Sequence, residues 1–348
     1  MIHEILGGFR VSKPKVYVTR RLPSPGVELL QEVCDVEINP DDSPPSRDLL
    51  TRKVQDMDGL LCLLTDRINS DLLSSTHRLK VVSSMSVGFD HIDIESATRK
   101  GIYVTFTPGV LTEATADFTW ALLMAVTRRV VETDHYLRTG KWKIQWTPTQ
   151  FLGVEFSGKT LGIVGMGRIG KAIAQRSKGF KMRVIYFNRT RIDREQERLL
   201  DIEYVPLNIL LRESDFVTIH VPLSKETRHM IDEDQLKQMK RTSYLVNTSR
   251  GPVVNQTSLT RALQEGWIAG AGLDVFEKEP IDGSDPLTGL DNVVLAPHIA
   301  SATKEARSKM AEVAAKNLIS VLRGEPPQYL VNKNVLNVKP LSSVKMIE

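Results

Sequence analysis

The sequence has 348 residues, of which 41% are hydrophobic and 25% are charged, a composition typical of a water-soluble globular protein rather than of a disordered or membrane protein. Its 46 basic and 42 acidic residues give a formal charge of +4 and are interleaved along the chain, so they indicate no nucleic-acid partner. The sequence has two cysteines, too few for a disulfide framework. No apolar run approaches the roughly 20 residues of a membrane span, and the start MIHEILGGFRVSK lacks the apolar core of a signal peptide. We therefore expect a cytoplasmic protein without a membrane partner.

Short apolar runs alternate with segments of helical spacing in the first hundred residues. The expected strands are KVYVT (15–19), LLCLL (60–64), LKVVSS (79–84) and IYVT (102–105). The segments between them include SRDLLTRKV and DIESATRK. Such alternation predicts parallel strands joined by crossover helices.

A long helical segment is expected from about Leu111 to Thr139, and the alternation then restarts. The expected strands of the second half are TLGIVG (160–165), RVIYF, DFVTIHV, SYLVN, GAGLDV and NVVLA. These strands are apolar almost throughout, which predicts a sheet covered on both faces. A second long helix, from about Thr303 to Leu322, closes the pattern, and we expect it to return to the first domain.

GIVGMGRIG (162–170) places Gly165, Gly167 and Gly170 in a GxGxxG pattern, directly after an expected strand and at the start of an expected helix. This is the context that a dinucleotide-binding fingerprint requires. Gly165 permits the tight turn, Gly167 lets the backbone approach a pyrophosphate, and Gly170 lets helix and strand pack closely. The pyrophosphate would lie at the positive end of the helix. The alternative is a glycine-rich turn needed only for packing.

VIYFNRTR (184–191) ends the next strand, where a carboxylate usually binds the ribose of NAD. Here Asn188 stands 18 residues after Gly170 and is followed by two arginines. An acid would repel a 2′-phosphate, whereas amide and guanidinium groups can bind it, so NADP(H) is the predicted cofactor and NAD(H) is possible. Alternatively the arginines are solvated and Asp193 or Glu195 binds the ribose. Cofactor contacts are expected from Gly165, Gly167, Arg168, Ile169, Gly170, Asn188, Arg189, Thr190 and Arg191.

Three further motifs place polar residues just after expected strands. They are NTSRG (247–251), LDVFEKEP (273–280) and LAPHIASAT (295–303). Ligands bind at this edge of an open parallel sheet, so Arg250, Glu279 and His298 could converge beside the nicotinamide. Taken singly, each has an ordinary alternative: a surface charge, a solvated acid, and a loop histidine held by a carbonyl.

PGVLTEATAD (108–117), LGIVGMGRIG, NTSRG, GLDVFEKEP and APHIASAT, in this order and spacing, resemble the D-specific 2-hydroxyacid dehydrogenase family. SMSVGFDHID (84–93) and the acid-free FNRTR look most like its glyoxylate and hydroxypyruvate reductase branch. The resemblance implies an α/β fold of two Rossmann-like or flavodoxin-like domains with parallel sheets. A dinucleotide-binding domain, residues 111–302, would be inserted within a substrate-binding lid domain made of residues 1–110 and 303–348.

The resemblance also implies catalytic roles. Arg250 would bind the carboxylate of a small 2-keto acid and polarise its carbonyl, His298 would be the acid/base, and Glu279 would partner His298. These roles suit the chemistry, because reduction needs a proton donor that is charged near neutral pH. A neighbouring carboxylate favours the imidazolium form and fixes its tautomer, while a planar guanidinium stabilises charge developing on the substrate oxygen.

Further site residues are implied in the same way. The backbone amides around Val87 and Gly88 would complete the carboxylate pocket, where glycine permits close approach. Asp274 would contact the nicotinamide carboxamide, and Thr115 would be another cofactor contact. Both Asp274 and Thr115 could equally be structural.

Other functions remain open. An NAD-dependent phosphoglycerate dehydrogenase is the nearest alternative, although only 50 residues follow His298, too few for an added regulatory domain. A formate dehydrogenase matches the motifs less well. From another class, a non-catalytic dinucleotide-sensing regulator could keep the same three polar residues.

KWKIQWTPTQFLG (141–153) carries Trp142, Trp146 and Phe151 in a segment with no clear period. These aromatics could pack on their own domain as a satellite core. Alternatively the preceding helix forms a two-fold interface and the aromatic loop reaches a second subunit. The resemblance favours a homodimer in which Trp146 borders the partner subunit's substrate pocket.

Overall fold

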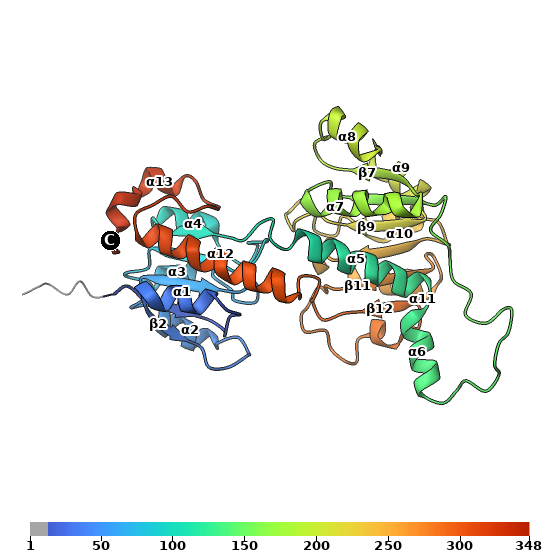
Figure 1. Cartoon of the computed structure of the whole chain (residues 1–348), viewed down its shortest axis with the longest axis horizontal. Coiled ribbons are helices and arrows are strands. Elements are labelled where there is room, and N and C mark those ends of the chain that lie inside the picture. The colour runs from blue at the N-terminus through green and yellow to red at the C-terminus, as the bar shows by residue number, and fades with distance from the viewer. Residues whose placement is uncertain (1–12, 348) are drawn as a thin grey trace, which may run out of the picture. The chain divides into compact units, whose positions relative to one another are not determined.

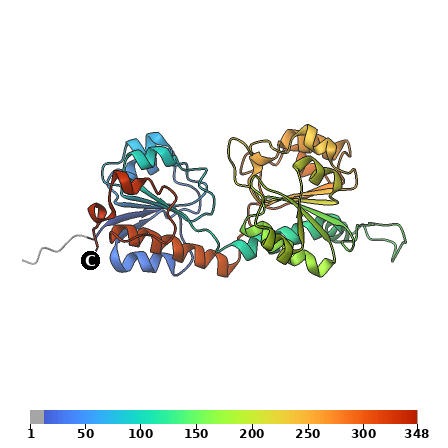
Figure 2. The same ribbon diagram turned by 90° about the horizontal axis from the view of Figure 1, so that it is seen from above.

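The computed structural model describes residues 13–347, which fold as two compact units (Figure 1). Unit 1 contains the described residues up to Val110 and those from Lys304 onward, and unit 2 contains Leu111–Thr303. Each unit has one sheet in which every paired strand is parallel, with helices on both faces (Figure 2). The α/β class predicted from the sequence is therefore confirmed.

Unit 1 is built on a five-stranded sheet of order β2-β1-β3-β4-β5, the flavodoxin-like order. The closing helix α12 lies against α1 and against β4 (Figure 1), and Ser83 Oγ of β4 donates a hydrogen bond of 2.8 Å to the carbonyl of Ala314 in α12. The elements of unit 1 are β1 (Lys15–Val18), α1 (Gly26–Val33), β2 (Asp35–Ile38), α2 (Arg47–Val54), β3 (Gly59–Cys62), α3 (Ser70–Ser74), β4 (Val81–Ser84), α4 (Ile94–Arg99), β5 (Tyr103–Thr105), α12 (Lys304–Leu322), α13 (Val335–Val338) and η4 (Leu341–Val344).

Unit 2 is built on a seven-stranded sheet of order β12-β11-β10-β9-β6-β7-β8. The strand order reverses between β6 and β9, and this switch point is where doubly wound sheets bind nucleotides. The elements of unit 2 are α5 (Thr112–Thr127), α6 (Val130–Arg138), β6 (Thr160–Val164), α7 (Arg168–Ser177), η1 (Lys178–Phe180), β7 (Arg183–Phe187), α8 (Arg194–Leu200), β8 (Ile202–Tyr204), α9 (Leu207–Glu213), β9 (Phe216–Ile219), α10 (Glu233–Gln238), β10 (Tyr244–Asn247), η2 (Gly251–Val253), α11 (Gln256–Gln264), β11 (Gly270–Leu273), η3 (Pro286–Gly289) and β12 (Val293–Leu295).

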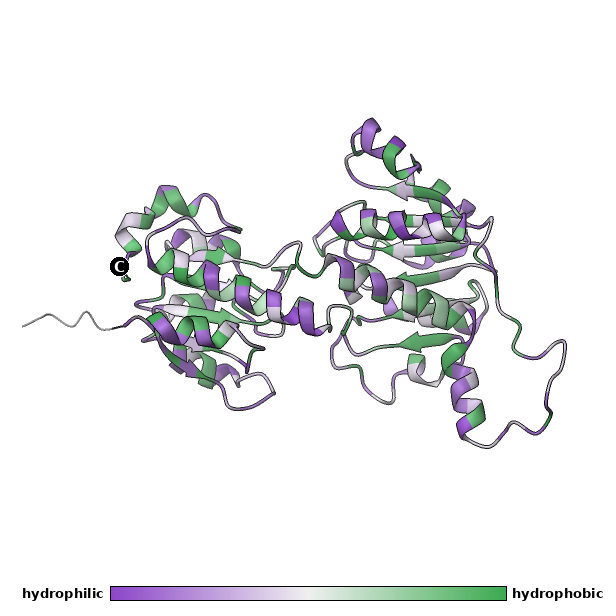
Figure 3. Cartoon of the chain, in the orientation of Figure 1, coloured by the Kyte–Doolittle hydropathy of each residue, from purple (hydrophilic) through white to green (hydrophobic). Residues whose placement is uncertain are grey.

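Hydrophobic burial accounts for the layers of each unit. Every residue of β3, β4, β9 and β11 is buried, and most strands are hydrophobic along their length, whereas the helices mix hydrophobic and hydrophilic residues (Figure 3). In unit 2, α5 and α7 pack against each other on one face of the sheet, and α10 and α11 pack together on the other (Figure 2). Both faces are thereby covered, as the apolar strands predicted.

The expectation of one long helix from Leu111 to Thr139 is wrong. The chain forms α5 and α6, separated at Arg129, whose backbone is in the left-handed region (φ 54°). The break is held by contacts that the helical spacing does not reveal. The carbonyl of Thr127 accepts the N–H of Val154 at 3.2 Å, and the Arg129 guanidinium lies 5.2 Å from the ring centre of Phe151.

Two short edge strands, β2 and β8, were not expected from the sequence. Each lies at the end of its sheet, and their sequences DVEI and IEY contain acidic residues with exposed side chains. Edge strands need no continuous apolar run, because one side of the strand faces solvent.

Among residues 13–347, none of the helices has the length and apolar character that crossing a membrane requires.

Candidate active site

The glycine-rich loop between β6 and α7 has the geometry of a phosphate cradle. A Cβ on Gly165 (φ 103°) would lie 2.7 Å from the carbonyl carbon of His220, and one on Gly170 would lie 2.2 Å from the oxygen of Gly165. A Cβ on Gly167 would meet no atom within 4 Å. The first and third glycines are thus required by packing, while the second leaves open space before the start of α7, where no side chain caps the helix. The loop therefore fits a dinucleotide pyrophosphate.

Asn188 fastens the loop after β7 to this cradle. Its Oδ1 accepts the N–H of Met166 at 3.3 Å, and its Nδ2 donates to the carbonyl of Thr190 at 2.7 Å. The exposed Arg189 has no hydrogen bond or ion pair with any described residue of 13–347. Arg189 therefore has a guanidinium that a ligand can bind without replacing a hydrogen bond.

Arg191, by contrast, is held by the buried carboxylate of Glu197. Its Nε and Nη2 donate to the two carboxylate oxygens at 2.8 and 2.7 Å, and Tyr186 donates its hydroxyl at 2.6 Å. The hydrogen bond from Arg191 is the main reason why the pKa of Glu197 falls to about 2, with the Tyr186 bond adding to it against the opposing effect of burial. The pair gives Arg191 a structural role that the sequence did not suggest, and the contact of Arg191 with the cofactor stays a prediction.

Arg250 lies in the loop after β10, which Asn247 shapes. Asn247 Nδ2 donates to the carbonyl of Arg250 at 2.9 Å, and its Oδ1 accepts both the N–H and the hydroxyl of Ser249 at 3.0 and 2.8 Å. The next residue, Gly251, lies against the neighbouring loop, because a Cβ there would be 1.8 Å from the carbonyl oxygen of Phe276. Only glycine permits this approach, so the loops that carry Arg250 and Glu279 are in direct contact.

Glu279 and His298 form a hydrogen-bonded pair. The distance from Glu279 Oε2 to His298 Nδ1 is 2.7 Å, and Glu279 Oε1 accepts the N–H of Phe276 at 3.0 Å. Burial is the largest influence on the pKa of Glu279 and would raise it. The hydrogen bond and charge of His298, the Phe276 N–H and the charge of Arg250 together outweigh burial, so the pKa is lowered. Glu279 is therefore a carboxylate at neutral pH.

Asp274 holds the backbone around His298. Its buried carboxylate accepts the N–H groups of Ile299 and Ala300 at 2.7 and 2.8 Å, and its carbonyl accepts the N–H of His298 at 2.9 Å. Burial raises the pKa of Asp274. His298 has a left-handed backbone (φ 55°), a strained conformation that such bonds can maintain. The proposed contact of Asp274 with nicotinamide stays a prediction.

Thr115 is buried on α5, where its carbonyl accepts the hydroxyl of Thr119 at 2.8 Å. The Thr119 and Thr248 hydroxyl oxygens are also 2.8 Å apart. Helix α5 is thus linked to the loop that carries Arg250. The contact of Thr115 with the cofactor stays a prediction.

The half-buried Val87 and Gly88 lie in unit 1, in the loop after β4. Ser86 Oγ donates to the carbonyl of Gly88 at 2.6 Å and lies 2.6 Å from Ser84 Oγ, which is 3.1 Å from His91 Nε2. Sequence reasoning noted this stretch only for its resemblance and missed the hydroxyl and imidazole groups that shape the loop. Their clustering in SMSVGFDH was the available signal.

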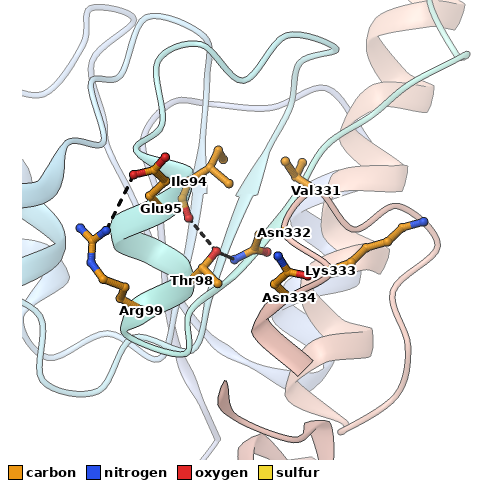
Figure 4. Close-up of a pocket in the computed structure, with 8 residues that line it drawn as sticks. All are labelled: Ile94, Glu95, Thr98, Arg99, Val331, Asn332, Lys333 and Asn334. Carbon is orange, nitrogen blue, oxygen red and sulfur yellow. Dashed lines mark hydrogen bonds and ion pairs between the residues drawn. The ribbon is translucent and has the colours of Figure 1, made fainter. Parts of the chain in front are cut away.

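A separate pocket of about 550 Å³ lies in unit 1, between α4 and residues 331–334 (Figure 4). Its central residue, Asn332, donates to Thr98 Oγ1 at 3.0 Å and to the carbonyl of Ile102 at 2.9 Å, and it accepts the N–H of Val104 at 2.8 Å. These bonds use all the polar atoms of the Asn332 side chain. The pocket wall therefore fastens the C-terminal segment to α4 and β5.

The aromatic residues of the loop that follows α6 divide into two groups. Phe151 packs edge-on against Tyr136 of α6, with ring centres 5.0 Å apart. Trp142 and Trp146 are 55% and 79% exposed. The satellite-core interpretation therefore holds for Phe151 and fails for the two tryptophans.

The chain is similar to proteins of one enzyme family. Residues 120–300 match the family model of the D-isomer specific 2-hydroxyacid dehydrogenase NAD-binding domain. The glyoxylate reductase of Thermofilum pendens is 56% identical over 338 residues, which cover 97% of this chain and 100% of that protein. A Thermus thermophilus protein of known structure, TT0316, is 44% identical with a TM-score of 0.86, covering 91% of this chain and 99% of its own.

A further solved structure is the NADPH-dependent glyoxylate/hydroxypyruvate reductase of Sinorhizobium meliloti with NADP and malonate. It is 30% identical with a TM-score of 0.81 and covers 93% of this chain and 98% of its own. The resemblance noted in the sequence is thereby confirmed, including its glyoxylate reductase branch. The chain belongs to the D-isomer specific 2-hydroxyacid dehydrogenases and is an NAD(P)-dependent dehydrogenase.

Proposed function

We propose that the protein reduces glyoxylate and other small 2-keto acids, including hydroxypyruvate, to 2-hydroxy acids with NADPH. The observation that carries the proposal is the 2.7 Å bond between Glu279 and His298, in the same unit as Arg250 and the glycine-rich loop. The relatives named glyoxylate reductase, 51% to 56% identical to this chain, support glyoxylate as the substrate.

Proton transfer is the role proposed for His298. Because Glu279 occupies Nδ1, Nε2 is the nitrogen that would give a proton to the carbonyl oxygen of the keto acid. The bound dinucleotide supplies the hydride that the carbonyl carbon accepts. One hydride and one proton then convert the keto acid to the hydroxy acid, and Glu279 stabilises the imidazolium before transfer.

Substrate binding is the role proposed for Arg250. Its planar guanidinium can bind the substrate carboxylate and stabilise the negative charge that develops on the carbonyl oxygen. Backbone N–H groups near Val87 and Gly88 of unit 1 would bind the same carboxylate, with unit 1 serving as the substrate-binding lid and unit 2 as the nucleotide domain. This division follows the two compact units.

Preference for NADPH rests on the end of β7. Asn188 replaces the usual ribose-binding acid, and the exposed Arg189 is available to a 2′-phosphate. The NADP-bound relative from Sinorhizobium supports the same choice. NADH remains a usable cofactor in this proposal, since the cradle itself does not distinguish the two.

A homodimer is also part of the proposal. Of the twelve large hydrophobic side chains exposed in the described part of the chain, seven lie between residues 130 and 152. They belong to α6 and the loop after it, and are Val130, Val131, Leu137, Trp142, Ile144, Trp146 and Leu152. Such a set of exposed hydrophobic side chains is typical of a subunit interface, with Trp146 reaching the partner's substrate pocket.

A cytoplasmic location is also proposed, and it agrees with two buried free cysteines, Cys34 and Cys62.

The test is a steady-state panel of glyoxylate, hydroxypyruvate and larger 2-keto acids, each assayed with NADPH and with NADH. We expect the highest kcat/KM for glyoxylate or hydroxypyruvate with NADPH. Turnover of phosphohydroxypyruvate with NADH alone would favour a phosphoglycerate dehydrogenase instead. Tight NADPH binding without turnover of any keto acid would favour a dinucleotide sensor.

A further inference from the structure

A second histidine–glutamate pair lies in the loop that carries Glu279. His229 Nε2 is 2.8 Å from Glu277 Oε1, and both side chains are about one-third exposed. Glu277 is two residues before Glu279, which bonds His298. The short segment 276–279 thus contacts two histidines from separate loops, one through each of its glutamates.

His229 is also fixed through its backbone. Its φ of 52° lies in the left-handed region, which costs free energy for a residue other than glycine and persists where surrounding contacts hold it. Here its N–H donates to the carbonyl of Pro252 at 2.8 Å. Pro252 follows Arg250 and Gly251, and Gly251 is the residue packed against the carbonyl of Phe276. His229 therefore touches both loops that carry the proposed active-site residues.

Glu277 receives further bonds that fix its position. Its Oε1 accepts the N–H of Gln256 at 3.1 Å, and its own N–H donates to Gln256 Oε1 at 3.0 Å. Gln256 begins α11. The segment 276–279 is therefore anchored to α11 and His229 at one end and to His298 at the other.

We propose that His229 is a positioning residue, which holds the loop of Glu279 so that this carboxylate meets His298 Nδ1. The imidazole attracts Glu277 when it is protonated, since Nε2 makes no well-aligned hydrogen bond among the described residues. This inference rests on the roles proposed above for Glu279 and His298. Its effect on the reaction passes through Glu279 and leaves the dinucleotide cradle unchanged.

The test is a double-mutant cycle of His229→Asn and Glu279→Gln. Asparagine tolerates the left-handed backbone, so it removes the imidazole without straining the chain. We expect His229→Asn to lower kcat about threefold to tenfold, within the usual range of coupling between neighbours, with NADPH affinity and thermal stability close to wild type. In the Glu279→Gln background the same change should have less than about a twofold effect, and Glu277→Gln should reproduce both results.

Two controls separate the possible failures. Arg261→Ala, on α11, breaks exposed ion pairs with Glu265 and Glu233 and should leave kcat unchanged. A loss from His229→Asn that persists fully in the Glu279→Gln background, or a higher keto-acid KM with unchanged kcat, would overturn the positioning role. Full activity of Glu279→Gln by itself would instead refute the proposed function of Glu279.

Discussion

Replacing Arg189 by alanine should weaken the binding of NADPH far more than the binding of NADH. The two cofactors differ only by the 2′-phosphate, so a loss confined to NADPH reports a contact with that group. Arg189 is exposed and makes no hydrogen bond or ion pair with residues 13–347. Its guanidinium can therefore bind a phosphate without breaking a hydrogen bond, although its charge also acts on the Glu226 carboxylate.

The size of the effect follows from the exposure of Arg189. A hydrogen bond to a charged group contributes about 1.5 to 3 kcal/mol, and solvent screening of an exposed charge places this contact near the lower value. We therefore expect the Kd for NADPH to rise about tenfold. The increase should shrink at high ionic strength, because salt screens the pair.

Fluorescence titration with NADPH and NADH measures both Kd values, and Arg191→Ala provides a matched comparison. Because Arg191 is bound to Glu197, its removal should lower Tm rather than change cofactor preference. The pKa of Glu197 is depressed from 4.5 to about 2, so the stabilisation is present above pH 4.5 and is lost as the pH falls towards 2. Equal affinity of the wild type for both cofactors, or an equal loss in Arg189→Ala, would refute the reasoning.

Further predictions concern the Glu279–His298 pair, the contact of Gly251 with Phe276, and Trp146 in the loop after α6. His298→Ala should lower kcat by about 10²- to 10⁴-fold with little change in NADPH affinity; loss of cofactor binding as well would assign His298 a structural role. Glu279→Gln should lower kcat, because His298 Nδ1 loses the carboxylate that fixes its tautomer; wild-type kcat in this variant would reject the pairing. Gly251→Ala should lower both Tm and kcat, since its Cβ would lie 1.8 Å from the Phe276 oxygen, and wild-type values would contradict the close packing. Trp146→Ala should change the ratio of kcat/KM among keto acids without a comparable change in NADPH binding, and a fully active monomer in sedimentation would contradict the dimer.

The sequence predicted the central strands of both units because burial on both faces demands near-continuous apolar runs. It also predicted the place of Arg250, Glu279 and His298, since each follows a strand and parallel strands end at one edge of a sheet. It could not predict the end of α5. The break at Arg129 depends on the Thr127 carbonyl and on Phe151, and the helical period of the segment continues through it.

The ion pair between Arg191 and Glu197 likewise could not be predicted from the sequence. Arg189 and Arg191 are chemically identical and two residues apart, yet one is available to a ligand and the other is bound to Glu197. The difference arises because Glu197 is buried, and the burial of a single acid within the polar helix α8 leaves no pattern in the sequence. A motif can therefore indicate the cofactor while leaving open which guanidinium binds it.

The two histidine–glutamate pairs differ in whether the order of strands in the sheet predicts their contact. Glu279 and His298 follow β11 and β12, which are adjacent in the sheet, so their contact follows from topology once the strands are known. His229 and Glu277 follow β9 and β11, which β10 separates. Their contact arises because Gly251, in the loop after β10, lets the neighbouring loop approach. Side chains from loops that follow non-adjacent strands then come into contact, which makes the glycine of NTSRG as important to the geometry of the site as the arginine before it.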